Sequence, residues 1–161
     1  MKKLRIYLDT SVINFLFADD APEKKAITVE FFERVVRRSN TVFGSPLVVI
    51  EIERTHNTER RIRLLAALQE YALPMLPPEP LPEVELLAEA YQRLGAIPLG
   101  HREDAMHVAI CTVNAVDVLV SWNFKHLANV NRERKIAAVN ASLGYVYPLR
   151  ITTPLEVMTN E

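Results

Sequence analysis

Asp9 stands where an acid could do chemistry, directly after a mostly apolar segment at residues 4–8 that predicts a buried strand. In an open α/β sheet, ligands and chemistry collect outside the carboxyl ends of the strands. Asp9 is therefore a candidate metal ligand or catalytic group. The alternative is structural, because Asp is a favoured N-cap and residues 12–17 predict a helix directly after it.

Two further carboxylates lie in apolar helical stretches. Glu51 comes six residues after Ser45. Its apolar neighbours at 47–50 and 52 argue against a position on a wholly exposed helix face. Asp104 precedes residues 105–111, which are apolar on nearly every side and predict a buried helix. A carboxylate buried there needs a partner or a metal. The alternatives are a solvated position for Glu51 and a first-turn acid favoured by the helix dipole for Asp104.

Asn123 and His107 add polar groups near these acids. Asn123 follows the predicted strand at 118–121 and Trp122, where its side chain could cap the next turn or give a metal a neutral oxygen. His107 is three residues beyond Asp104 and shares its helix face. On a buried helix we expect it to be a hydrogen-bonded core histidine. The four histidines lack the spacing of a zinc site.

The acids together predict a divalent-cation site. Converging carboxylates repel one another, and hard oxygen ligands select Mg²⁺ or Mn²⁺. Such an ion can polarise a phosphoryl oxygen and lower the pKa of a bound water. Glycine-rich phosphate loops and a nucleophile elbow are missing from the sequence. An aspartate-nucleophile phosphatase would need a second acid two residues after Asp9, where Ser11 stands.

Length and composition limit the class of protein to which the chain can belong. A length of 161 residues suits one domain with a sizeable core, and the net charge of -1 argues only against a wholly basic nucleic-acid binder. The single Cys111 excludes an internal disulfide and is expected to be a small buried side chain. A run of about 18 apolar residues is missing, so we expect no membrane span and a cytoplasmic location.

Strand-like and helix-like segments alternate along the whole chain, which predicts an α/β fold. Short apolar strands separated by helices indicate a mainly parallel sheet covered on both faces, so we expect a single-domain, three-layer α/β/α architecture. A largely buried helix should begin at Ser45-Pro46, and residues 122–127 should form a short helical turn. The other predicted strands are 41–43, 73–76 and 145–147, and the other predicted helices are 22–38, 59–71, 82–94, 101–114 and 132–141.

Four segments resemble the PIN-domain ribonucleases, a family that includes the toxin subunits of VapBC-type toxin–antitoxin pairs. The segments are 7–14, 45–52, 102–109 and 118–127, in the family's order. The resemblance spans essentially the whole chain and implies a single PIN-like domain over 1–161. It implies an Mg²⁺- or Mn²⁺-dependent endoribonuclease that hydrolyses RNA, with an antitoxin as protein partner and a homodimer or higher oligomer as its assembly.

The resemblance also implies roles for individual residues. By position, the metal ligands would be Asp9, Glu51 and Asp104; Ser11 or Thr10 would help to place the metal or its water; and Asn14 would support the loop by hydrogen bonds. The family often has an aspartate where this chain has Asn123, so one negative charge is missing. That difference leaves a second hypothesis open, a catalytically weak PIN-like domain that binds RNA or a protein.

RNA binding would need local positive charge. Basic residues cluster on the helix predicted at 59–71 and near the end of the 118–121 strand: Arg60, Arg61 and Arg63, and Lys125, Arg132, Arg134 and Lys135. Phosphate contacts from such residues would position a substrate without reading its sequence. The alternative is that both groups are ordinary solvated surfaces. Lys125 is the first candidate, because it lies two residues from Asn123.

Overall fold

A four-stranded parallel sheet with strand order β2-β1-β3-β4 forms the centre of the molecule. The computed structural model describes residues 3–77 and 81–160. The strands are β1 (Ile6–Leu8), β2 (Val42–Phe43), β3 (Val118–Val120) and β4 (Arg150–Thr152). Ile6 pairs with Val42 on one side and Val118 on the other. Because all strands run in one direction, their carboxyl ends meet at the edge where Asp9 follows β1.

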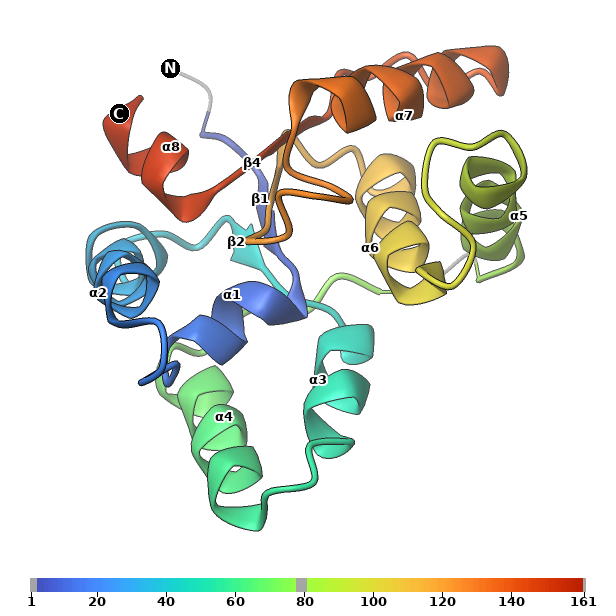
Figure 1. The fold of residues 1–161 in the computed structure, drawn as a ribbon. Coiled ribbons are helices and arrows are strands. Elements are labelled where there is room, and N and C mark those ends of the chain that lie inside the picture. Colours follow the sequence, from blue (N-terminus) through green and yellow to red (C-terminus); the bar gives the residue numbers. More distant parts are fainter. Residues whose placement is uncertain (1–2, 78–80, 161) are drawn as a thin grey trace.

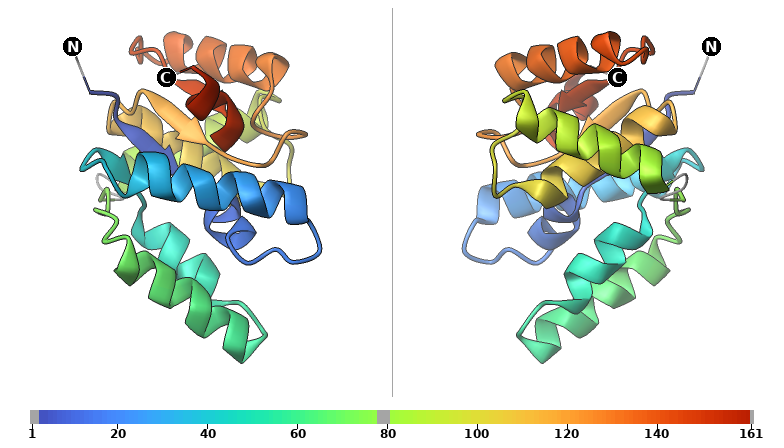
Figure 2. Two further views of the ribbon diagram at one scale, coloured as in Figure 1. Left: turned by 90° about the vertical axis from the view of Figure 1, so that its left-hand side faces the viewer. Right: turned by 90° about the vertical axis from the view of Figure 1, so that its right-hand side faces the viewer.

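Helices cover both faces of this sheet. They are α1 (Thr10–Phe15), α2 (Pro22–Phe31) with its π-helical continuation η1 (Phe32–Val36), α3 (Pro46–Glu53), α4 (Thr58–Glu70), α5 (Leu81–Arg93), α6 (Arg102–Val113), α7 (Val130–Ser142) and α8 (Pro154–Thr159). Figure 1 shows α2 and α8 on one side of the sheet and α5, α6 and α7 on the other. The predicted three-layer architecture is confirmed. The α3–α4 pair projects beyond these layers (Figure 2).

The two central strands are buried on both faces. Tyr7, Leu8, Leu119 and Val120 have no exposed surface, and they belong to one continuous cluster of buried hydrophobic side chains. Burying an aliphatic side chain of this size contributes about 1.5–3 kcal/mol to folding. The apolar sequence of these strands therefore positions Asp9 on a rigid support.

Local signals fix several helix ends. Side chains cap the amino ends of α1, α4, α7 and α8, and these caps are Asp9, Asn57, Asn129 and Thr153. Such caps stabilise a helix by about 1 kcal/mol each. Gly95 follows α5 with a φ of 76°, a left-handed conformation in which glycine is favoured. These positions explain why the predicted helices agree with the observed ones to within a few residues.

Two predicted strands are wrong. Residues 73–76 form only one isolated parallel bridge, between Gly44 and Met75, because Pro74 has no N–H to extend a ladder. Residues 145–147 form no strand, and Val146 is 85% exposed. The last strand is β4 instead, where Ile151 alone is buried between exposed Arg150 and half-buried Thr152. One buried residue in three gives too weak an apolar pattern to predict a strand.

Residues 122–127 contain the predicted short turn, in which the Leu127 amide donates to the Asn123 carbonyl at 3.1 Å. Two smaller corrections concern helices. The helix α3 is buried on one face only: Val48 and Ile52 are buried, whereas Ile50 is 46% exposed, because α3 projects from the sheet with α4. The six-residue α8 was not predicted.

Cys111 is buried and unpaired, as expected. Within 3–77 and 81–160, the helices are too short or too polar to cross a membrane.

Candidate active site

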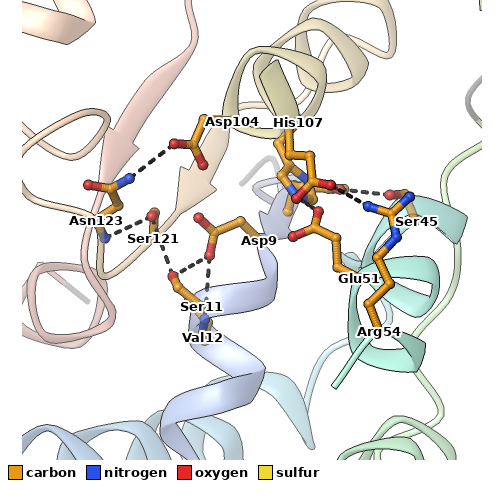
Figure 3. Close-up of polar contacts among 12 residues, drawn as sticks. Asp9, Ser11, Val12, Ser45, Glu51, Arg54, Asp104, His107, Ser121 and Asn123 are labelled. Carbon is orange, nitrogen blue, oxygen red and sulfur yellow. Dashed lines mark hydrogen bonds and ion pairs between the residues drawn. The ribbon is translucent and has the colours of Figure 1, made fainter. Parts of the chain in front are cut away.

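The structure brings the acids singled out in the sequence to one end of the sheet. Asp9 follows β1, Glu51 lies on α3, and Asp104 lies in the first turn of α6. Asn123 belongs to the turn after β3. Figure 3 shows Asp9 between Asp104 and Glu51, with Asn123 beside Asp104. Three elements distant in sequence thus deliver carboxylates to the carboxyl edge of the strands.

Asp9 is both a helix cap and a member of this group. Its side chain is almost completely buried, and Oδ1 accepts hydrogen bonds from Ser11 Oγ at 2.5 Å and from the Val12 amide at 3.4 Å. Both of these hydrogen bonds end on Oδ1. Burial raises the pKa of Asp9; His107 and neighbouring hydroxyls oppose that rise, and Asp104 adds to it. Capping therefore leaves one oxygen of a buried carboxylate for another use.

Asp104 is held by Asn123. The Asn123 amide Nδ2 donates to Asp104 Oδ2 at 3.1 Å, and the same oxygen lies 3.2 Å from His101 Nδ1. The other end of the Asn123 amide, Oδ1, accepts from the His126 backbone at 3.0 Å and so caps the turn. An aspartate at 123 would face Asp104 as a second negative charge, whereas asparagine gives Asp104 a donor.

Glu51 ends a chain of buried hydrogen bonds. His107 Nε2 lies 2.5 Å from Glu51 Oε1, and His107 Nδ1 lies 2.6 Å from the Tyr7 hydroxyl. The Tyr7 hydroxyl lies 2.7 Å from Ser45 Oγ. With a neutral imidazole that carries its proton on Nε2, each group donates to the next in the order Ser45, Tyr7, His107, Glu51; in the charged imidazolium, Nδ1 donates to Tyr7 and Tyr7 donates to Ser45. We call these four residues the Glu51 relay.

The electrostatics of the relay follow from burial and from the nearby acids. Burial by itself lowers the pKa of His107, but the hydrogen bond and charge of Glu51, with the charges of Asp9 and Asp104, outweigh it and raise the pKa. Burial raises the pKa of Tyr7 well above its ordinary value, so the phenol keeps its proton. His107 is therefore a buried group that takes up positive charge among three carboxylates.

Serine hydroxyls connect Asp9 to the turn after β3. Ser11 Oγ accepts from the Trp122 amide at 3.0 Å while donating to Asp9, and Ser121 Oγ accepts from the Asn123 amide at 3.0 Å. Of the two hydroxyl residues singled out beside Asp9, Ser11 is the one that donates to the Asp9 carboxylate. The Thr10 hydroxyl is buried and has no hydrogen-bond partner within the described residues.

The candidate RNA-contact residues occupy different environments. Arg60 donates to the backbone carbonyls of Phe17 and Asn14, at 3.1 and 3.0 Å, and so ties α4 to the end of α1. Asn14 enters this contact through its backbone. Arg61 donates to the Thr55 carbonyl at 2.7 Å. Lys125 is exposed in the turn after Asn123. Arg60 and Arg61 thus already bind carbonyl oxygens, whereas Lys125 lies exposed in the turn that contains Asn123.

Sequence reasoning missed two features of the site. The first is the use of Tyr7 and Ser45 in the Glu51 relay, because a tyrosine inside a buried strand predicts core packing only. The second is an ion pair between Arg54 and Glu103, 2.5 Å apart, which joins the end of α3 to the start of α6. Both partners are exposed, and their separation in sequence gives no signal.

The donor chemistry of the site fits Mg²⁺ or Mn²⁺. Asp9, Asp104 and Glu51 offer carboxylate oxygens, which these hard cations prefer. Burial raises the pKa of Asp9 and so makes its carboxylate costly to ionise, a cost that a bound cation would lower. In the arrangement of residues 3–77 and 81–160, no three His, Cys, Asp or Glu side chains are close enough together to hold an ion. Glu51 is turned to His107, so a three-carboxylate site requires its side chain to shift.

The family model described as PIN domain matches residues 6–131. A crystal structure of a member of the VapBC family of toxin–antitoxin systems, VapBC-5 from Mycobacterium tuberculosis, has a similar fold, with a TM-score of 0.49 and 15% sequence identity. The alignment covers 92% of this chain and 98% of that chain. The search of curated proteins gave no match.

Proposed function

The chain belongs to the PIN domain family, and on this premise we propose that it is a metal-dependent endoribonuclease that hydrolyses phosphodiester bonds in RNA. The observation that carries the proposal is the convergence of Asp9, Glu51 and Asp104 at the carboxyl edge of the sheet. The cofactor would be Mg²⁺ or Mn²⁺, because the donors are carboxylate oxygens.

Two of the residues that would hold the metal, Asp9 and Asp104, are already oriented by hydrogen bonds. Asp9 is fixed through Oδ1 by Ser11 and keeps Oδ2 for the ion, and Asp104 is fixed by Asn123. A bound divalent cation supplies a polarised phosphoryl oxygen and a more acidic water. Partners that orient ligands in this way raise metal affinity and activity. We expect Asp9 and Asp104 to be the two dominant ligands.

Glu51 would be the third ligand, with His107 as its positioning residue. The imidazole holds Oε1 at 2.5 Å, and the Tyr7 hydroxyl fixes the other ring nitrogen. The relay thereby limits where the Glu51 carboxylate can go. It also places a group of raised pKa beside the acids, which offsets their mutual repulsion in the absence of metal.

We extend the proposal to a toxin-type component that an antitoxin protein keeps inactive, acting as a homodimer or higher oligomer in the cytoplasm. The support is the order of four motifs that resemble those of toxin subunits. The test is expression of the chain alone in a bacterial host. Growth should stop, and both Asp9→Asn and co-expression of a small neighbouring gene should restore it. Unimpaired growth at full expression would contradict the toxin role.

A second candidate function is favoured by Asn123. Its amide donates to Asp104 where an acid would add negative charge, which weakens the site for a second cation. A chain of this kind would bind RNA or a protein and cleave slowly. The Asn123→Asp variant separates the two functions, as set out in the Discussion.

The experiment that tests the proposed activity uses a circular single-stranded RNA, which only an endonuclease can open. Purified protein should linearise it in Mn²⁺ or Mg²⁺, and a chelator should stop the reaction until metal is added back in excess. Linearisation that continues in chelator would contradict metal dependence. Shortening of linear RNA with an intact circle would contradict the endonuclease assignment.

A further inference from the structure

An exposed aromatic ring lies one residue beyond the candidate active site. Phe124 is 47% exposed and follows Asn123, whose side chain contacts Asp104. Its backbone is fixed on both sides: the amide donates to the Trp122 carbonyl at 3.0 Å, and the carbonyl accepts from Asn129 Nδ2 at 2.6 Å. The ring is therefore anchored in the turn that also touches Asp104.

The buried Trp122 side chain packs against this ring. The Trp122 ring lies 6.0 Å from the Phe124 ring in an edge-on arrangement and 5.9 Å from the Phe15 ring. Trp122 is 6% exposed, and its indole N–H donates to Thr28 Oγ1 at 2.9 Å. The Trp122 backbone amide donates to Ser11, the partner of Asp9. The aromatic cluster is thus connected to both Asp9 and Asp104.

The amine of Lys24 lies over the same rings. Lys24 Nζ is 5.2 Å from the centre of the Phe124 ring, 5.5 Å from Phe15 and 5.7 Å from Trp122. The next residue, Lys25, pairs with Asp19 at 2.5 Å. Within the described residues, no ion pair of Lys24 is recorded. Its charge is held by ring faces and is available to an anion.

We propose that Phe124 and Lys24 form a nucleotide subsite, in which an unpaired base stacks on Phe124 and Lys24 binds the adjoining phosphate. The proposal rests on the proposed ribonuclease function and names its substrate as RNA with an unpaired nucleotide beside the cleaved bond. Stacking on an aromatic ring accepts any base, and a lysine–phosphate contact positions RNA without reading its sequence. A base inside a duplex has both faces covered by its neighbours, so duplex RNA cannot use this subsite.

The test measures the affinity for RNA in an Asp9→Asn background, where cleavage is expected to be lost and Asn can still cap α1. A fluorescent single-stranded oligonucleotide should bind this protein more tightly than its duplex. Adding Phe124→Ala should raise the Kd for the single strand about tenfold, the effect of losing one stacked base. Adding Phe124→Trp should restore the affinity, because the larger ring also stacks.

Two further variants complete the design. Lys24→Gln should weaken binding and lower the slope of log Kd against log salt by about one, as expected for one lost phosphate contact. Leu86→Ala removes an exposed apolar side chain from α5 and should change neither quantity. A single-strand Kd that Phe124→Ala leaves unchanged would overturn the subsite and leave the ribonuclease proposal intact. An Asp9→Asn protein that binds no RNA would contradict the proposed function itself.

Discussion

His107 Nε2 lies 2.5 Å from Glu51 Oε1, so a buried histidine of α6 holds the carboxylate that α3 brings to the site. His107 is 2% exposed and the Glu51 side chain is 16% exposed, which keeps most water away from the contact. The contact joins two elements that carry different acids of the site. It links the position of Glu51 to the core of the protein through Tyr7.

Tyr7→Phe tests the Glu51 relay. The substitution removes one hydroxyl and leaves His107 Nδ1 and Ser45 Oγ without their partner, which should cost about 1–3 kcal/mol in the free energy of unfolding. Because Glu51 loses its fixed orientation, the RNA cleavage rate should fall about 10–100-fold. Denaturant unfolding and a cleavage assay measure the two effects.

The matched control is Tyr91→Phe. The Tyr91 hydroxyl is also buried and bonds Thr112 and Asn140, away from the acids. We expect a similar loss of stability with an unchanged cleavage rate. Equal rates for the two variants would show that the relay has only a structural role.

The raised pKa of His107 predicts a pH dependence of stability in the metal-free protein. The folded state keeps the histidine proton to higher pH than the unfolded chain, whose pKa is near 6.5. The resulting stability is fully present below that pH and is lost as pH rises through the folded pKa. Burial lowers this pKa, and the contacts and charges of Glu51, Asp9 and Asp104 outweigh burial and raise it.

Unfolding by denaturant at a series of pH values measures this contribution. His107→Gln should reduce the loss of stability above pH 6.5. The control is His56→Gln, a change at an exposed histidine, which should lose stability above this pH as the unmodified protein does. A fall that is the same in all three proteins would show that His107 is not its source.

Asp9→Asn should stabilise the metal-free protein at neutral pH. Burial raises the pKa of Asp9, so the carboxylate contributes stability at low pH that is lost as it ionises. Asparagine caps a helix as well as aspartate does and carries no charge. The expected rise in Tm is about 2–4 °C, the shift that 1 kcal/mol causes in a chain of this size.

The same melting experiment with Mn²⁺ tests the metal site. Mn²⁺ should raise the Tm of the unmodified protein, because a ligand of the folded state stabilises it, and should not raise that of Asp9→Asn. Asp20→Asn, at an exposed carboxylate between α1 and α2, should keep the Mn²⁺ effect. An undiminished Mn²⁺ effect in Asp9→Asn would remove Asp9 from the proposed ligands.

Asn123→Asp distinguishes the two candidate functions. The new carboxylate would face Asp104, so the metal-free protein should lose stability, by an amount that Mg²⁺ or Mn²⁺ restores. An active ribonuclease should change its cleavage rate less than about tenfold. A much larger gain in rate would support the catalytically weak domain, whose site lacks a fourth acid.

The sequence predicted the parallel sheet well, because the sheet follows from a simple pattern. Apolar strands between helices indicate a parallel sheet, and acids placed directly after strands or in first turns must gather at one edge. Asp9 and Asp104 were found on these grounds. The strand at 145–147 was wrong, because Tyr and Val in an exposed loop imitate a strand pattern, whereas β4 has one buried residue.

Side-chain contacts between distant elements could not be predicted. The Glu51 relay joins β1, α3 and α6, and its register depends on how α6 rotates against the sheet. The role of Arg60 shows the same limit. A cluster of arginines suggests an RNA surface, yet the Arg60 guanidinium is used to bind the carbonyls at the end of α1.

The role of the three carboxylates in metal-dependent cleavage is tested by the cleavage rates of three proteins on one single-stranded RNA. We expect Mn²⁺-stimulated cleavage by the unmodified protein and by Asp20→Asn. We expect loss of that activity in Asp104→Asn, because the metal loses a carboxylate while the contact with Asn123 can remain. Equal cleavage by Asp104→Asn and the unmodified protein would remove Asp104 from the metal site and refute the proposed mechanism.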